Sequence, residues 1–410
     1  MSFAQDKNQR TMKKIITMLV AAALVACAKE SSEMAVPADN TANESISLEE
    51  LAGILSEIPF GSSQVQEVYD AVSSSSDNGY DEEYTMQNLF SSPGSGVGED
   101  DTSTKSSSYT VPLRDLISEY VQSLSLTKAS DIDADEWLES LSSSDLQIYW
   151  PYSSTWDGSQ LPVITYAPDS DADTLNVGYL IADTSTGERT VSEVVVSEEM
   201  AKERPVWVIN RNYDSEYTSL ELLRRSDPDW GNAGGGITVS SVRSSEDGDD
   251  TVKALYIKDF IATRNYDSWF AGASEFFIKC GSVEDFTAST EAELLLYEPT
   301  ITDFMVVVKR SQIGDTIDLN TVLVSEWNED LDSSIAFMMT EYDGGTLDTW
   351  DIEATVKLNS KSWGITVSIP VYTKDDIVWR GSMTKSYLEA IDGEMSSFGD
   401  VKLTFEIVEL

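Results

Sequence analysis

Residues 365–371 read Ile-Thr-Val-Ser-Ile-Pro-Val, and this alternation of apolar and polar side chains is the pattern that decides the fold. Successive side chains of a β-strand point to opposite faces, so such a run buries one face and exposes the other. Further runs of this kind lie at 255–261, 274–279, 304–309, 316–324, 335–340, 352–358 and 401–408, with Gly, Asp and Asn marking the turns. These alternating runs therefore predict that the C-terminal part of the chain is an all-β antiparallel sandwich.

The part of the chain before this sandwich mixes two patterns. Apolar residues recur at helical spacing within 48–72, 113–121 and 135–141. Strand-like runs follow at 146–150, 163–166, 177–181, 191–196 and 206–209. Helices followed by strands predict an α+β N-terminal domain, so the expected fold class is α+β followed by an antiparallel β-sandwich.

Composition shifts along the chain predict its organisation. We expect a signal peptide at 1–26, a tether at 27–44, a helical hairpin with a Ser- and acid-rich linker at 45–108, an α+β domain at 109–228, a linker at 229–251 and the sandwich at 252–410. The pentapeptide Arg-Asn-Tyr-Asp-Ser occurs twice, at 211–215 and 264–268, each time after a strand-like run. Five residues are too few to indicate a duplicated domain.

The N-terminal region carries a secretory signal. Lys13 and Lys14 precede an apolar run at 15–26, which is shorter than the roughly 20 residues of a membrane span. The run ends in Leu24-Val25-Ala26-Cys27, which resembles the lipobox of bacterial lipoproteins. The resemblance implies that Cys27 receives the lipid and that acyl chains anchor the protein to a lipid bilayer.

Charge and composition exclude several functions. The chain holds 72 acidic and 27 basic residues, a net charge of −45, so it lacks the basic surface that a nucleic acid partner requires. It contains no histidine, which excludes Ser-His-Asp triads, Cys-His pairs and His-ligated zinc. With Cys27 lipidated, Cys280 has no partner for a disulfide, and its strand-like run predicts a small buried thiol. We expect no enzyme activity.

Two acidic segments are candidate calcium sites, because hard cations prefer oxygen ligands. Asp169, Asp171 and Asp173 alternate as in the opening of an EF-hand loop. Thr174 stands where that loop needs glycine, and Leu180 where it needs glutamate, so an acidic hairpin loop is the favoured interpretation.

The second acidic segment lies in the predicted sandwich. The strand at 335–340 runs into the acidic, Gly-rich stretch 341–351, which resembles a metal loop of C2-type sandwiches. That resemblance implies calcium bound by Asp267, at the tip of the loop 263–272, together with Asp343 and Asp348. Aspartate and glycine are also the residues that turns prefer, so ordinary turns remain the alternative.

An aromatic segment suggests a ligand-binding surface. Trp150, Tyr152 and Trp156 lie close together in the sequence and would stack on a sugar if their rings were exposed. The same residues anchor a hydrophobic core when buried, and this second interpretation is favoured.

The chain as a whole resembles the envelope lipoproteins of the Bacteroidetes group, through its lysine-led signal, lipobox, acidic Ser-rich tether and β-rich C-terminal part. The resemblance implies attachment to the outer membrane, at its periplasmic or cell-surface face. We expect a non-catalytic binding or interaction module whose ligand is a glycan or a protein. A carboxylate-based glycan hydrolase and a pilin-like fimbrial subunit are the alternatives.

Overall fold

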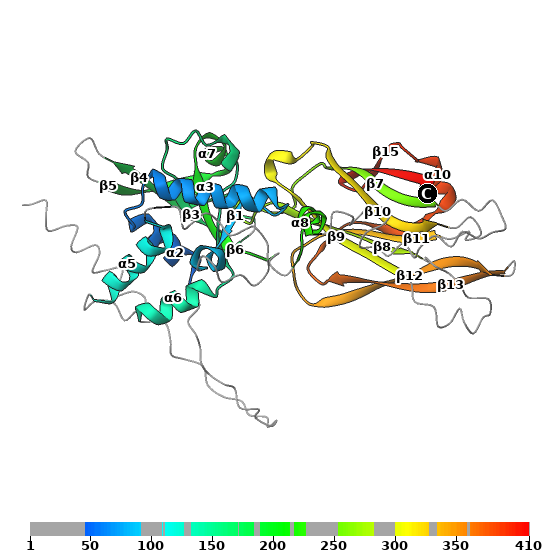
Figure 1. Cartoon of the computed structure of the whole chain (residues 1–410), viewed down its shortest axis with the longest axis horizontal. Coiled ribbons are helices and arrows are strands. Elements are labelled where there is room, and N and C mark those ends of the chain that lie inside the picture. The colour runs from blue at the N-terminus through cyan, green and yellow to red at the C-terminus, as the bar shows by residue number, and fades with distance from the viewer. Residues whose placement is uncertain are drawn as a thin grey trace, which may run out of the picture. The chain divides into compact units, whose positions relative to one another are not determined.

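The protein is represented by a computed structural model (Figure 1). It describes residues 46–91, 109, 111–126, 133–170, 172–183, 189–213, 217–226, 253–282, 300–327, 334–358 and 361–409. The predicted signal peptide, with Cys27, and the predicted linker 229–251 lie outside the described residues. The structure confirms the fold class, an α+β N-terminal domain followed by an antiparallel β-sandwich.

The N-terminal domain is built on one six-stranded sheet with the order β1-β2-β6-β3-β4-β5. Its strands are β1 (Glu83–Thr85), β2 (Leu146–Tyr149), β3 (Val163–Tyr166), β4 (Leu175–Asp183), β5 (Arg189–Ser197) and β6 (Val206–Arg211). The pair β3 and β6 is parallel, whereas the other pairs are antiparallel. The helices of this domain are α2 (Leu48–Glu57), α3 (Ser62–Asp77), α4 (Met86–Phe90), α5 (Leu113–Ser125), α6 (Ala134–Ser142) and α7 (Glu198–Glu203).

Alternation along the strands gives this sheet two buried faces. Ile148 and Trp207 point to the face that helices α2 to α6 cover, where they join one hydrophobic core. Val206 and Val208 point to the other face, where they pack with α7 and with Trp269 and Phe270 of a loop from the sandwich. The same sheet therefore packs against both its own helices and the C-terminal domain.

The sandwich consists of two four-stranded sheets with the orders β10-β7-β16-β15 and β14-β11-β8-β9. Its strands are β7 (Lys253–Ala262), β8 (Ser274–Ser282), β9 (Thr300–Val308), β10 (Ile317–Trp327), β11 (Ser334–Glu341), β14 (Asp376–Thr384), β15 (Met395–Phe398) and β16 (Val401–Glu409). Helix α8 (Leu220–Ser226) precedes the sandwich in sequence, and α10 (Lys385–Ala390) lies between β14 and β15. Phe276, Phe337 and Phe405 meet in the core between the sheets, where Cys280 is also buried, as predicted.

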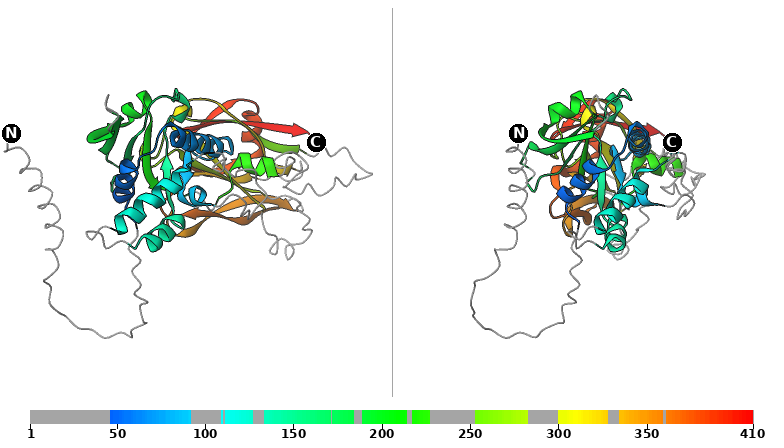
Figure 2. Two further views of the ribbon diagram at one scale, coloured as in Figure 1. Left: turned by 60° about the vertical axis from the view of Figure 1, so that its left-hand side comes forward. Right: turned by 90° about the vertical axis from the view of Figure 1, so that its left-hand side faces the viewer.

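A long hairpin forms a third layer on the sandwich. It consists of β12 (Leu347–Leu358) and β13 (Lys361–Tyr372), drawn in orange in Figures 1 and 2, and it contacts β8 and β11. The Lys279 ammonium donates to the carbonyl of Pro370 at 2.8 Å, which holds the hairpin to the outer face of β8. A Cβ on Gly281 would lie 2.1 Å from a methyl group of Val367, so glycine is what lets the two layers approach.

Two features differ from the expectation. The helices at 48–77 do not form a segment of their own, because β1 joins the six-stranded sheet and both helices share its core. Strands β14 and β15 were not predicted. Among the described helices, none combines the length and the apolar character that crossing a bilayer requires.

Candidate functional site

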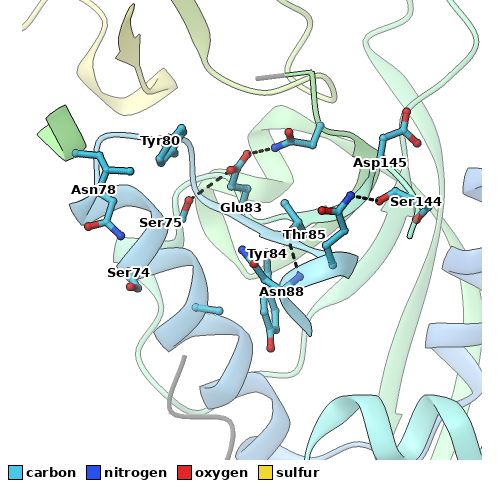
Figure 3. Close-up of a pocket in the computed structure, with 14 residues that line it drawn as sticks. Ser74, Ser75, Asn78, Tyr80, Glu83, Tyr84, Thr85, Asn88, Ser144 and Asp145 are labelled. Carbon is cyan, nitrogen blue, oxygen red and sulfur yellow. Dashed lines mark hydrogen bonds between the residues drawn. The ribbon is translucent and has the colours of Figure 1, made fainter. Parts of the chain in front are cut away.

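A polar pocket lies where α3 ends, beside β1 and α4 (Figure 3). Its volume is about 290 Å³. Hydroxyl, amide and carboxyl side chains dominate its lining: Ser74, Ser75, Asn78, Tyr80, Glu83, Tyr84, Thr85, Gln87, Asn88, Ser144, Asp145 and Asn212, with Ala71 and Leu222. We call this the polar pocket.

Glu83 is the central charged group of the polar pocket, and its hydrogen bonds fix its position. The Asn212 amide donates to one carboxylate oxygen at 2.8 Å and to the Gln147 side chain at 2.9 Å. Ser75 approaches the other oxygen at 3.5 Å (Figure 3). Asp145, at the rim, pairs with Arg211 at 2.5 Å. Both carboxylates therefore already have donors.

A second, acidic pocket of about 510 Å³ adjoins the first and shares Glu83 and Asn212 with it. Its lining combines residues of both domains: Asp81, Glu83, Gln147, Arg211, Asn212 and Tyr213 with Asp267, Ala271, Ala273, Glu275, Tyr342, Asp343 and Lys374. Carboxylates outnumber cationic groups there. The acidic pocket is therefore suited to a cationic ligand.

Three carboxylates come together at this acidic pocket. Asp267 lies in the loop between β7 and β8, Glu275 is near the start of β8, and Glu341 ends β11. One carboxylate oxygen from each lies within 4.8 Å of the others. Pairing of β8 with β11 brings the two glutamates together, because Glu341 is opposite Phe276 and the Tyr342 amide donates to the Glu275 carbonyl. We call these three residues the carboxylate cluster.

Burial dominates the electrostatics of the carboxylate cluster. Glu341 is 0% exposed, and burial raises its pKa far above the ordinary value. The neighbouring Asp267 raises it further, followed by Asp343 and Asp376. Two adjacent carboxylates are both acceptors, so they need either a shared proton or a cation between them.

Contacts with the N-terminal domain hold the loop 263–273, which carries Asp267. The Asn210 amide donates to the carbonyls of Phe270, at 3.0 Å, and Ala271, at 2.5 Å. The buried Asp81 carboxylate accepts from the Ala273 amide at 2.8 Å. Arg310 donates to the Asp267 carbonyl at 3.2 Å. The position of Asp267 thus depends on both domains.

The predicted calcium ligands are placed differently from one another. Asp267 belongs to the carboxylate cluster, and Asp343 lines the same acidic pocket. Asp348 is exposed in β12 and accepts from the Thr349 amide at 2.8 Å. Asp169 and Asp173 are exposed, whereas Asp171 lies outside the described residues. The structure therefore brings together two of the residues that the C2-type resemblance implied.

The predicted aromatic surface is largely a packing cluster. Trp150 is 1% exposed and lies in the core, so its ring offers no face to a ligand. Trp156 packs against Trp150 and Tyr69, at ring-centre distances of 5.4 and 5.2 Å. Tyr152 donates its hydroxyl to Glu198 at 2.7 Å. Burial corrects the sugar-stacking interpretation for Trp150 and supports the core interpretation.

Sequence reasoning missed Glu275, Glu341, Glu83 and Asn212. The two cluster glutamates lie at the ends of apolar strands, where a charged residue next to a buried run was the available signal. The repeated pentapeptide was another signal, since Asn212 from one copy and Asp267 from the other line the same acidic pocket. No family model, curated protein or solved structure matches this chain.

Proposed function

We propose that this chain is a lipid-anchored, non-catalytic binding protein of the bacterial outer membrane. In this proposal the polar pocket holds a small neutral ligand rich in hydroxyl groups, such as one sugar unit of a glycan. The observation that carries it is the lining, where hydroxyl and amide side chains such as Ser74, Thr85 and Asn88 surround about 290 Å³. Small-molecule sites start at about 300 Å³, so the size of the polar pocket suits a single sugar ring. These groups can replace the water that a sugar hydroxyl loses on binding.

The hydrogen bonds of the polar pocket favour binding over hydrolysis. A glycosidase needs two carboxylates that face the bound sugar, one as an acid and one as a base or nucleophile. Glu83 accepts from Asn212 at 2.8 Å, and Asp145 pairs with Arg211 at 2.5 Å. Since the chain has no histidine, imidazole cannot take either role.

Ligand binding is tested by titration calorimetry of the purified chain with neutral mono- and disaccharides. The variant Asn88→Leu places an apolar group in the lining of the polar pocket while leaving the core untouched, because Asn88 is exposed. We expect this variant to lose the binding heat. Gln122→Leu changes an exposed amide of α5 outside the polar pocket and should bind like the parent. Equal binding by both variants, or no binding of any saccharide by the parent, would refute the assignment.

Anchoring is supported by the lipobox at Leu24-Val25-Ala26-Cys27. The variant Cys27→Ala lacks the thiol that would carry the lipid. We expect it to leave the membrane fraction of the producing bacterium and to lose incorporation of labelled palmitate. Unchanged membrane association without label would contradict lipid anchoring at Cys27.

A further inference from the structure

We propose that Asp267, Glu275 and Glu341 bind one divalent cation, and that the ion is Ca²⁺. The first argument is geometric. Each residue contributes a carboxylate oxygen, and these oxygens lie within 4.8 Å of one another. Two oxygens bonded to the same Ca²⁺ at about 2.4 Å are at most about 4.8 Å apart, so each pair of these oxygens lies within the span that one ion can bridge.

The second argument is independent of the acidity of the region. Glu341 is 0% exposed, and neither of its carboxylate oxygens accepts a hydrogen bond from any described donor. A buried carboxylate without a donor is strongly destabilising, and proteins generally satisfy such groups with a cation or a partner. The cluster carboxylates lie beside Glu341, but another acceptor cannot satisfy it without a proton or a cation.

Two cationic side chains of the sandwich, Arg310 and Lys279, have carboxylate partners outside the cluster. Arg310 donates to the Glu198 carboxylate at 2.8 Å and to the backbone carbonyl of Asp267 at 3.2 Å. Lys279 donates to Pro370 and approaches Asp303 at 3.8 Å. Lys374 lines the acidic pocket.

The donor set indicates which ion fits. Carboxylates without histidine or thiolate ligands select hard cations. Ca²⁺ accepts irregular geometry and six to eight oxygens, and water from the adjoining pocket of about 510 Å³ can complete its shell. Mg²⁺ requires near-octahedral geometry and shorter bonds, so carboxylates on two strands and a loop favour Ca²⁺.

The site lies at the joint between the two domains, which gives cation binding a structural effect. Asp267 belongs to the loop that Asn210 and Asp81 hold from the N-terminal domain, whereas both glutamates belong to sheet strands of the sandwich. An ion that bridges them therefore ties this loop to the sandwich. We expect Ca²⁺ to stabilise the whole folded part by mass action.

The test is calorimetric titration of Ca²⁺ into the chelator-treated full chain in detergent, with a melting curve in parallel. The expected result is one Ca²⁺ per chain at moderate salt and a higher melting temperature. Glu341→Gln and Glu275→Gln should each weaken the affinity by about 100-fold or more, because ligand charge sets Ca²⁺ affinity. Glu275 is not fully buried, so its variant keeps the proposal testable if Glu341→Gln does not fold.

The matched control is Asp348→Asn, which removes an exposed carboxylate outside the cluster and should bind like the parent. Asn88→Leu should also bind Ca²⁺ normally, so failure of the sugar proposal and failure of this one can be told apart. No binding by the folded parent would overturn the proposal. Parent-like binding by Glu275→Gln would overturn it too, because the ions would then bind elsewhere on the acidic surface.

Discussion

Replacing Trp269 by alanine tests how the two domains hold each other. Trp269 is 3% exposed and packs against Phe270 in a tilted arrangement, with ring centres 3.9 Å apart. It packs with Val206 and Val208 of the six-stranded sheet, and its indole N–H donates to the Thr174 carbonyl at 2.9 Å. The substitution therefore removes both apolar contact and a hydrogen bond between the domains.

The expected cost follows from these two contributions. Truncating a buried tryptophan to alanine costs about 3–5 kcal/mol, because apolar contact is lost and a cavity remains. The hydrogen bond to Thr174 adds about 1 kcal/mol. Trp269→Phe keeps most of the ring and loses mainly the hydrogen bond, so it should cost about 1–2 kcal/mol.

The measurement is urea unfolding followed by far-UV circular dichroism. We expect the parent to unfold in one cooperative transition, and Trp269→Ala to separate unfolding of the N-terminal domain from that of the sandwich. The Phe variant should retain a single transition at a slightly lower midpoint. If Trp269→Ala lowered the free energy of unfolding by less than about 1 kcal/mol and kept a single transition, the idea that this loop joins the domains would be refuted.

Two further predictions concern single positions. Gly281→Ala should lower the free energy of unfolding by about 1–3 kcal/mol, because its Cβ would lie 2.1 Å from Val367. Adding Val367→Ala should recover part of that loss in the same urea assay, and strictly additive losses would contradict the close packing. Burial raises the pKa of Glu67 to about 7, so the folded state takes up a proton more readily than the unfolded state. The free energy of unfolding of the parent should therefore fall as pH rises from about 4.5 through 7. Above pH 7, Glu67→Gln should be more stable than the parent by up to about 3 kcal/mol. Equal pH profiles of the two proteins would disprove this assignment.

Most strands of the sandwich were predictable because alternation is a local signal. Residues 365–369 alternate between buried and exposed side chains within β13, as their sequence indicates. Strand β14 escaped prediction because its pairing with β11 shifts register near Thr340, which breaks the alternation between its buried residues Val378 and Met383. Such a bulge cannot be predicted from the local sequence alone.

The pairing of strands that are distant in the chain could not be predicted from the sequence. The parallel alignment of β3 with β6, and the addition of the short β1 to the edge of the sheet, depend on tertiary contacts. For this reason the helices at 48–77 appeared to be a separate segment, although they share a core with residues up to Ile209.

The candidate site was predictable where it uses loops. Asp267 and Asp343 were found because acidic loops next to strands are visible in the sequence. Glu275 and Glu341 belong to strands whose apolar residues dominate the pattern, and only the β8–β11 pairing places them together. Exposed Asp348 was included because composition cannot tell a solvated acid from one that faces a neighbour.

The contact of Trp269 and Phe270 with the six-stranded sheet has a consequence for how the protein is made. Synthesis runs from the N-terminus at about 5–20 residues per second, so Val206 and Val208 leave the ribosome before the residues that cover them. The two domains are therefore completed in sequence. The loop of the sandwich, which is made later, covers the apolar face of the six-stranded sheet, which is made earlier. A chain that stops short of residue 263 would keep an apolar face that chaperones and proteases can recognise.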